Sequence, residues 1–422
     1  MVIAQLDRKS VGGLKALLST MNFAPGQVNP GNPLVPFAQL ENLHFARFVI
    51  LNDQTLDDIR LYGLPRQEYP LYLAFLCDFD GAAAPFLTDL IHCAGPGLRR
   101  VFSHCADFAD GADLHRWIRD HDIPVATSYV SWRGRTVKQA REEFALRQAI
   151  DTYFNAHAAA LESQSPEQVR VQVRQFVNAE IAAGRLALTG PAPTPLTEQI
   201  GNAIHFVVVL PLILLVGLLV LPLLLLIRLR ENTEPVLAPR PEAGPEARLA
   251  IIEDHEVANQ FSAMGSLKPG LVRRWMLSYI LWVIEWTARH LYTKGRLARV
   301  RTIHFARWVF LDGKKRILFA SNYDGSLDSY MDDFINKVSF GLNVVFCNGI
   351  GYPKTRWLLA GGATDEQTFK YFLRRHQLPT QVWYHAQPNI TAVELERNTL
   401  IRQGVQAGAL SAAAAREWVQ LL

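Results

Sequence analysis

LHFARFV, at residues 43–49, returns as IHFARWV at residues 303–309. A second stretch does the same, because FLCDFDG at residues 75–81 returns as FASNYDG at residues 319–325. The copies also stay in step beyond these stretches, in the matched pairs Gly97–Leu98 with Gly341–Leu342 and His121–Pro124 with His376–Pro379. Agreement over several separate stretches predicts a domain that occurs twice, once on each side of a long apolar segment.

The second copy shows the order of its elements most clearly. Residues 304–311 have the pattern of a strand, Asp312 and Gly313 suit a tight turn, and residues 316–323 return as the second strand of a hairpin. Two helices and a last strand follow, predicted at residues 326–342, 365–376 and 381–385. Strand pairs joined by helices of this size indicate a ferredoxin-like α+β plait. We therefore predict an α+β fold in which two internally duplicated ferredoxin-like units form an intramolecular α/β barrel, with a membrane-inserted apolar segment in addition.

Charge and cysteine content exclude several classes of protein. The net charge is only +4 and no basic stripe with interleaved aromatic residues is present, so no nucleic-acid partner is expected. The four cysteines include no CxxC pair, which predicts reduced thiols rather than a disulfide framework or a metal finger. The N-terminus lacks the apolar core and cleavage site of a signal peptide. We expect the first domain to stay in the cytoplasm.

The apolar segment between the copies is long enough to cross a bilayer. Residues 206–227 contain no charged or hydrogen-bonding side chain. If helical, these 22 residues extend over roughly 33 Å, against a hydrocarbon core of about 30 Å. Arg228 and Arg230 follow directly, so the positive-inside bias places this flank in the cytoplasm. The alternative is a core helix of a soluble protein.

The duplication limits how this segment can enter the membrane, because copies that pack on each other must lie on one side. The segment can be re-entrant, broken at Pro211, Gly217 and Pro222; it can pair with a second crossing at residues 271–292; or the copies do not pack together. Residues 271–292 carry three tryptophans between charged ends and suit an interfacial helix. An amphipathic helix packed on the repeat is the alternative. We favour a monotopic or hairpin anchor, with both repeats cytoplasmic and membrane lipid as a partner.

The same patterns divide the chain into eight segments. These are an N-terminal helix and loop (1–40), the first ferredoxin-like repeat (41–155), an amphipathic helix and linker (156–200), the membrane segment (204–228), a Pro-rich linker (229–270), the interfacial amphipathic helix (271–295), the second repeat (300–405) and a C-terminal helix (406–422).

Polar residues gather in the second copy around the shared Asp-Gly pair. On a regular strand His304 and Arg307 point to opposite faces, so they are not expected to meet at one ligand. An acidic stripe at every fourth residue suits a divalent cation, a basic partner or a solvated helix N-terminus. No phosphate loop, nucleophile motif or metal-ligand motif is present, so no metal site is predicted. The stripe consists of Asp324, Asp328, Asp332 and Asn336, and the other polar residues at this end are Ser321, Asn322, Tyr323, Asn348, Tyr352 and Arg356.

A duplicated plait with a strand that ends in Asp-Gly resembles the dimeric α/β-barrel superfamily, which includes dye-decolourising haem peroxidases and chlorite-dismutase-like proteins. The peroxidases carry a G-x-x-D-G signature, and SNYDG at residues 321–325 matches its Asp-Gly but has serine in place of the leading glycine. The resemblance implies haem as a cofactor. In that case Asp324 is the distal acid, Arg307 or Arg356 stabilises charge, and Asn322 and Tyr352 line the cofactor site. The proximal imidazole comes from His376, His304 or His385.

Two functions follow from these observations, and whether the protein is an enzyme stays open. The first is a membrane-anchored protein at the cytoplasmic face, in which the duplicated barrel acts as a ligand-binding or accessory module, with a protein partner in addition to lipid. The second is a haem-dependent, peroxidase-like oxidoreductase that uses the second repeat.

Overall fold

The computed structural model describes residues 1–191 and 193–422. They form two compact units: unit 1 comprises Met1–Trp132 and Pro195–Asn389, and unit 2 comprises Arg133–Thr194 and Ile390–Leu422. With 51% helix and 18% strand in several sheets, the chain has the mixed α+β class that the sequence predicts. We call residues 1–132 and 195–389 the first half and the second half of unit 1.

Unit 1 contains two four-stranded antiparallel sheets, and two short hairpins lie outside them. The first sheet has the order β1 (Val2–Gln5), β5 (Tyr72–Phe79), β4 (Leu43–Leu51), β12 (Thr380–His385). The second has the order β7 (Ala258–Ser266), β9 (Arg316–Asp324), β8 (Ile303–Leu311), β6 (Thr127–Val130). The hairpins are β2 (Asn22–Ala24) with β3 (Gln27–Val28), and β10 (Thr355–Arg356) with β11 (Ala360–Gly361).

Each sheet takes its last strand from the other half of unit 1. β12 of the second half pairs with β4, and β6 of the first half pairs with β8. Before it reaches the other sheet, the segment that leads to β6 or to β12 runs beside the first strand of its own half. The Ile3 N–H donates to the carbonyl of His121 at 3.1 Å, and the Leu378 N–H donates to the carbonyl of Ser262 at 2.8 Å. The segments that precede β6 and β12 therefore contact first the sheet of their own half and then the other sheet.

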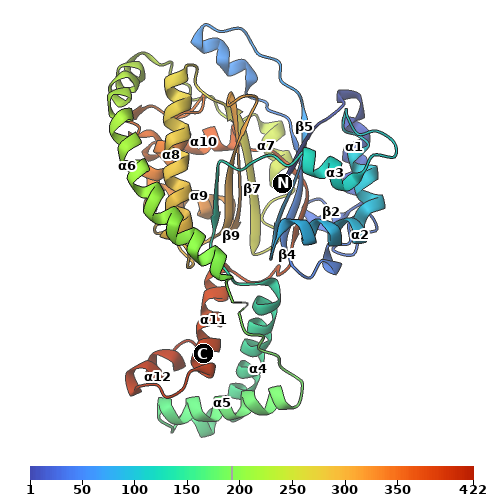
Figure 1. Ribbon diagram of the computed structural model, residues 1–422, viewed down its shortest axis with the longest axis vertical. Coiled ribbons are helices and arrows are strands. Elements are labelled where there is room, and N and C mark those ends of the chain that lie inside the picture. Colours follow the sequence, from blue (N-terminus) through green and yellow to red (C-terminus); the bar gives the residue numbers. More distant parts are fainter. Residues whose placement is uncertain (192) are drawn as a thin grey trace. The chain divides into compact units, whose positions relative to one another are not determined.

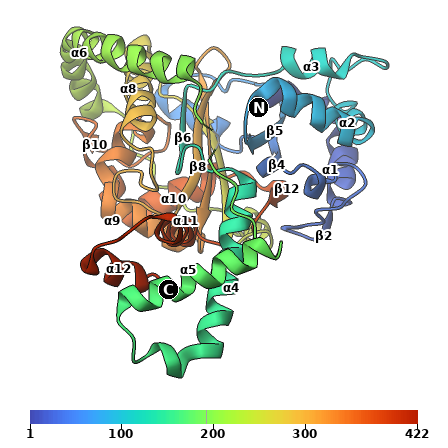
Figure 2. The same ribbon diagram turned by 60° about the horizontal axis from the view of Figure 1, so that its bottom comes forward.

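Helices cover the outer faces, so unit 1 has helix, sheet, sheet and helix layers (Figures 1 and 2). The first sheet is covered by α1 (Val11–Ser19), α2 (Ala83–Phe102) and α3 (Leu114–Asp120), and the second by α8 (Leu271–His290), α9 (Leu327–Phe346) and α10 (Glu366–His376). Between the sheets, the C-terminal ends of β4 and β8 contribute aliphatic side chains. Burial of each large one contributes roughly 1.5–3 kcal/mol. This inter-sheet core includes Val49, Leu51, Leu76, Val309, Leu311 and Leu318.

Two strands of the four-stranded sheets, and the short hairpin of β2 and β3, lie where the sequence pattern predicted no strand. β7 falls in the segment predicted as a linker (229–270), and β1 falls in the predicted N-terminal helix and loop (1–40). Nearly every residue of β7 is buried, because helices cover one face of its sheet and the other sheet covers the second face. A strand buried on both faces shows no alternation of polar and apolar residues. The assignment of 229–270 as a linker is therefore wrong for β7, although α7 (Ala243–Ala250) and a short Pro-rich stretch do occupy part of it.

The apolar segment is one helix, α6 (Leu196–Thr233), long and apolar enough to span a membrane. The break considered for a re-entrant segment is absent, because α6 passes through Pro211 and Pro222 without interruption. Gly217 serves a different purpose: a Cβ there would lie 2.6 Å from the hydroxyl of Tyr279 on α8. The glycine lets α6 and α8 approach closely, and the two helices run side by side (Figure 1).

Unit 2 consists of four helices from distant parts of the chain: α4 (Val137–Leu161), α5 (Pro166–Ala182), α11 (Ala392–Gln406) and α12 (Ala412–Val419). Three of them begin with capping boxes, in which Thr136, Ser165 and Thr391 cap the first turn. Their apolar sides form a separate core around Val173, Ile401 and Trp418. The predicted repeat boundaries at 155 and 405 are therefore corrected, because α4 and α11 pack in unit 2.

Candidate functional site

A histidine is paired with an aspartate in each half of unit 1. In the second half, His304 Nε2 lies 2.6 Å from Asp324 Oδ1, and the two side chains are 6% and 5% exposed. In the first half, His44 Nε2 lies 2.9 Å from Asp80 Oδ1, and the side chains are 18% and 20% exposed. A carboxylate bonded to one ring nitrogen fixes the orientation of the imidazole.

Both pairs depend on the same two backbone features. The strand register shifts around His304 in β8 and around His44 in β4, and such a bulge removes a residue from regular alternation. The expectation that His304 and Arg307 point to opposite faces assumed a regular strand, which β8 is not at His304; the two side chains bind different partners, Asp324 and Asp78. After each aspartate the glycine is left-handed, with φ of +83° at Gly81 and +82° at Gly325. The repeated Asp-Gly pair therefore has a local structural cause.

Two arginines cross between the sheets in opposite directions. Arg47 of β4 donates to backbone carbonyls of β7 and β9 at 3.0 and 2.9 Å. Arg307 of β8 pairs with Asp78 of β5, and Asp78 also accepts from Asn322 Nδ2 at 3.1 Å. Burial lowers the pKa of Arg47 to about 9 and that of Arg307 to about 10. Buried cations are tolerated only with such partners, so the arginines specify how the sheets face each other.

A third imidazole lies at the same end of the inter-sheet space. His385, the last residue of β12, pairs with Glu256. The ring of Phe45 joins the groups, with its centroid 5.3 Å from that of His304, 5.4 Å from Trp383 and 6.3 Å from His385. We call the three pairs the histidine cluster: His44–Asp80, His304–Asp324 and His385–Glu256.

The histidine cluster can orient imidazoles and hold protons, but the neighbouring thiol is not a nucleophile. Burial raises the pKa of Cys77 to about 12, so the thiol stays protonated. Within residues 1–191 and 193–422, no three His, Cys, Asp or Glu side chains are placed to hold a metal ion. His385 Nδ1 is buried and has no hydrogen-bond partner among those residues. Two of the three pairs lie within one sheet, and only His385–Glu256 joins β12 of the first sheet to the segment before β7 of the second.

Haem does not fit His376 or His304 as its proximal ligand. His376 is buried, donates from Nδ1 to the carbonyl of Phe372 at 2.7 Å, and borders a cavity of only about 30 Å³. A Cβ on Gly265 would already lie 2.9 Å from His376 Nε2. His304 is bonded to Asp324 through Nε2, and His385 through Nε2 to Glu256. A proximal imidazole needs a free nitrogen that faces a porphyrin-sized space, and neither His376 nor His304 meets this need.

The other predicted site residues lie in three different places. Asn322, Asp324 and Arg307 belong to the inter-sheet space. Tyr352 donates to Asn343 Oδ1 at 2.8 Å in the helix layer outside the second sheet, which also holds His376. Arg356 is exposed on β10. The structure thus does not assemble the predicted set into one site.

Of the acidic stripe, Asp324 ends β9 and pairs with His304, whereas Asp332 on α9 forms a surface ion pair. Asp332 lies 2.7 Å from Lys370 Nζ, and Asp333 lies 2.7 Å from Lys337 Nζ. Exposed pairs of this kind contribute about 0–1 kcal/mol. The part of the stripe that lies on α9 fits the solvated-face interpretation.

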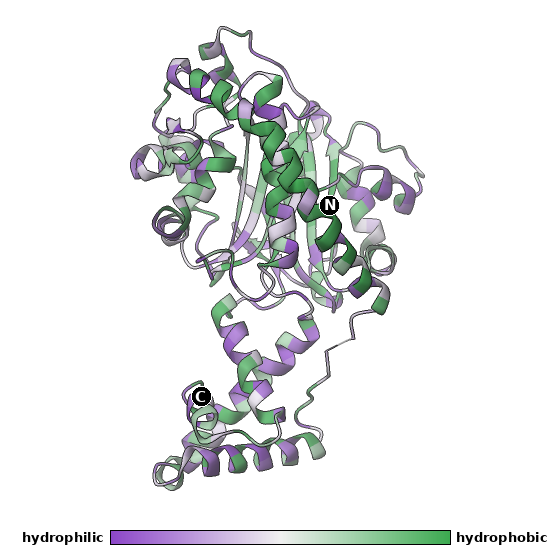
Figure 3. Ribbon diagram, turned by 60° about the vertical axis from the view of Figure 1, so that its left-hand side comes forward, coloured by the Kyte–Doolittle hydropathy of each residue, from purple (hydrophilic) through white to green (hydrophobic). Residues whose placement is uncertain are grey.

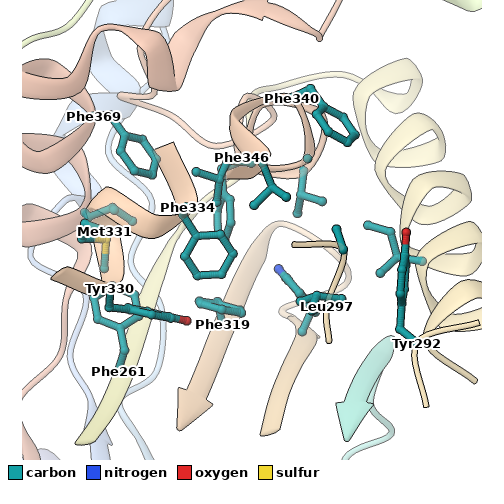
Figure 4. A pocket seen from close by; sticks show the side chains of 18 of the residues that line it. Phe261, Tyr292, Leu297, Phe319, Tyr330, Met331, Phe334, Phe340, Phe346 and Phe369 are labelled. Atoms are coloured by element: carbon teal, nitrogen blue, oxygen red, sulfur yellow. The ribbon is translucent and has the colours of Figure 1, made fainter. Parts of the chain in front are cut away.

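An apolar pocket of about 280 Å³ lies between α8, α9 and the outer face of the second sheet (Figure 4). Its walls include Val283 and Ile284 from α8, Phe334 from α9, and Trp308 and Phe319 from the sheet. No charged side chain is among the described residues that line it. Sequence reasoning missed this pocket, because apolar residues at helical spacing indicate a core and do not show whether it is filled.

One face of α6 contacts the rest of unit 1 along the length of the helix. Near its N-terminus, Asn202 accepts from Arg289 at 2.7 Å, and in the middle the carbonyl of Ile213 accepts from the Tyr279 hydroxyl at 3.1 Å. At the C-terminal end, Glu231 accepts from the backbone N–H of Trp357 at 2.8 Å, and Glu234 lies 2.6 Å from Arg273. The other faces of α6 expose leucines.

The chain matches no protein-family model, no curated protein and no solved structure.

Proposed function

We propose that this protein is a membrane-anchored binding module, in which unit 1 is a duplicated ferredoxin-like domain forming an intramolecular α/β barrel and α6 attaches it to the lipid surface. The observation that carries the proposal is the exposed leucine surface of α6. It lies on a helix that unit 1 holds from end to end. No catalytic step is part of the proposal.

The exposed surface of α6 is too apolar for water. Figure 3 shows the middle of α6 in the hydrophobic colour, and the polar residues of the helix lie at its two ends. Contiguous apolar patches on soluble proteins rarely exceed a few hundred Å², and larger ones are typical of membrane or protein interfaces. The exposed leucines are Leu212, Leu214, Leu215, Leu218, Leu219, Leu221, Leu225, Leu226 and Leu229, each between 45% and 69% exposed.

The attachment of α6 favours a helix that lies along the membrane surface. A helix of 38 residues is about 57 Å long, nearly twice the hydrocarbon thickness of about 30 Å. Contacts with unit 1 run from Asn202 to Glu234, so a perpendicular crossing would carry α8 and part of unit 1 into the bilayer. Arg273, which is buried on α8, makes that costly. A monotopic anchor avoids this cost and keeps both halves on one side.

Matched details of the two halves support the duplicated barrel. The two sheets have the same strand order, and Tyr129 lies opposite Ala306 as Tyr384 lies opposite Ala46. The segments before β6 and β12 touch one sheet and then join the other, so each closes one edge between the sheets. Such closure is the device by which barrels protect strand edges.

Co-flotation with liposomes tests the anchor. The full chain is mixed with vesicles of phosphatidylcholine and phosphatidylglycerol and centrifuged through a density gradient. Wild type is expected to float, and the double variant Leu218→Asp/Leu225→Asp is expected to remain at the bottom, because the apolar face of an interfacial helix enters the boundary between headgroups and acyl chains, where a carboxylate loses its hydration. The matched control, Phe23→Asp/Leu61→Asp, changes two exposed apolar residues elsewhere in unit 1 and is expected to float. Failure of wild type to float contradicts the proposal.

A second experiment separates lying on the membrane from crossing it. Single cysteines replace Gly201 and Asn232, at the two ends of α6, in a Cys93→Ser background. Reaction of both with an impermeant maleimide from the same side of sealed vesicles is expected. Reaction from opposite sides would show that α6 crosses the bilayer and would end the monotopic arrangement.

A further inference from the structure

The helix layers of the two halves differ at one pair of matched glycines. In the first half a loop packs against the glycine, whereas in the second half the space beside it is open and forms part of the apolar pocket. Gly97 on α2 and Gly341 on α9 occupy the same place in the sequence match. A Cβ on Gly97 would lie 1.8 Å from the carbonyl oxygen of Leu34, since the loop before β4 packs against α2 there. A Cβ on Gly341 would meet nothing within 4 Å. Gly341 lines the pocket instead.

The walls of the pocket define the class of ligand. Its volume of about 280 Å³ is nearly twice that of an engineered apolar cavity of about 150 Å³ that stays dry and binds benzene. Phenylalanines from α9 and α10 surround it in Figure 4, among them Phe334, Phe346 and Phe369. Its lining offers no ionised group to a polar ligand. A hydrocarbon chain fits this environment.

A basic loop adjoins the pocket. Leu297 and Ala298 line it, and their neighbours in sequence are the exposed Arg296 and Arg299. The loop is held in a tight bend by backbone hydrogen bonds between Leu297 and Val300, and Ala298 is left-handed with φ of +54°. A left-handed alanine is strained by about 1 kcal/mol or more. This bend presents two apolar side chains to the pocket while cations flank it.

The pocket also lies directly behind the proposed membrane helix. Val283, Ile284 and Thr287 of α8 line the pocket, while Tyr279 and Trp286 of the same helix contact α6. α8 therefore contacts both α6 and the pocket. Phe340, at the pocket, is 59% exposed.

We propose that this pocket binds one fatty acyl chain of an anionic amphiphile, with the chain among the phenylalanines and the acidic head beside the loop that carries Arg296 and Arg299. The source is a free fatty acid or one chain of an anionic phospholipid, and both present the same chemistry. The inference rests on the proposed membrane attachment only where the acyl chain comes from a membrane phospholipid.

Photo-crosslinking tests the pocket in the full chain on vesicles. The probe is palmitic acid that carries a diazirine in its chain, and modified peptides are mapped by mass spectrometry. Labelling is expected at residues 283–298 and 330–346 in addition to α6. Gly341→Phe fills the pocket without a clash at Cβ and should lower the pocket labelling about tenfold, because roughly two methylene contacts are lost. The matched control is Gly12→Phe on α1, where a Cβ also meets nothing within 4 Å, and its labelling is expected to equal wild type.

Two further arms identify the head group and the source. Arg296→Ala/Arg299→Ala should reduce pocket labelling by the fatty acid but not by its methyl ester. Phosphatidylglycerol with a diazirine in one chain, added in place of the acid, labels the pocket if the source is a membrane lipid.

The readouts separate the two proposals. Labelling of α6 without labelling of the pocket in folded wild type overturns the acyl-chain site and leaves the anchor standing. Labelling of the pocket without labelling of α6 supports the acyl-chain site and overturns the anchor. Equal pocket labelling in Gly341→Phe and Gly12→Phe also overturns the acyl-chain site.

Discussion

The two halves of unit 1 share a plan between the sheets and differ outside them. Between the sheets, each half contributes a His–Asp pair at a bulge, a left-handed glycine and an arginine that reaches the other sheet. Outside, the first half packs its loop against α2, whereas the second half has the long α8, the apolar pocket and α6. The difference indicates that the shared interior holds the sheets together and that the second half carries the surfaces available for binding.

The largest effect should come from adding one methyl group at the matched glycines. Gly97→Ala forces a Cβ to within 1.8 Å of a backbone oxygen and should destabilise unit 1 by about 3 kcal/mol or more. Gly341→Ala enters open space within a helix and should stabilise by about 0.5–1 kcal/mol. Urea denaturation followed by circular dichroism measures both. Similar losses in both variants would show that the two helix layers are equally packed.

Removing the histidine of either His–Asp pair should lower the free energy of unfolding, by more in the second half than in the first, and by less than Gly97→Ala does. His304→Ala removes a donor from a buried carboxylate and should cost about 2 kcal/mol, and His44→Ala, at a pair that is more exposed, should cost about 1 kcal/mol. Unfolding free energies of the two variants, measured side by side, test the order. A larger loss at His44 would contradict the expectation that the more buried pair, His304–Asp324, contributes more to stability.

The pH dependence of stability should depend on His376, whose match in the first half is His121. Both imidazoles bond through Nδ1 to the carbonyl four residues earlier, but His121 Nε2 meets Asp107 whereas burial lowers the pKa of His376 below its usual 6.5. The unfolded chain therefore binds this proton more readily than the folded chain, so stability is complete above pH 6.5 and falls as the pH drops below it. His376→Gln should flatten the loss of unfolding free energy below pH 6.5, and His121→Gln serves as the control. An unchanged slope in His376→Gln would refute the role.

The smallest effect concerns the thiols and leaves stability unchanged. Cys347 of the second half is buried, which raises its pKa to about 11, whereas Cys93 of the first half is only partly buried. A thiol reagent should modify Cys93 first in the folded chain and Cys347 only after unfolding. The variant Cys93→Ser should lose the fast phase. Fast modification of Cys347 would show that the helix layer of the second half opens.

Several elements could be predicted because their causes are local. The predicted strand at 304–311 is present as Ile303–Leu311. The predicted turn is present at Asp312 and Gly313, with φ of +52° and +62°. The helix predicted to start near Ser326 is present as Leu327–Phe346. Turn residues, caps and helical spacing act over a few residues. The candidate site was less predictable, because the bulge at His304 depends on its pairing with β9 and the partners of Arg307 come from the other sheet.

The sequence by itself determined the α+β class, the local hairpin and helices, and the existence of a helix as apolar as α6, since each follows from short-range patterns. Only the tertiary structure decided the rest. The exchange of β6 and β12, the assembly of α4, α5, α11 and α12 into unit 2, and the pocket beside Gly341 all join residues far apart in the chain. Whether such surfaces meet, and whether they fill the space between them, depends on packing energies that no single stretch of sequence contains.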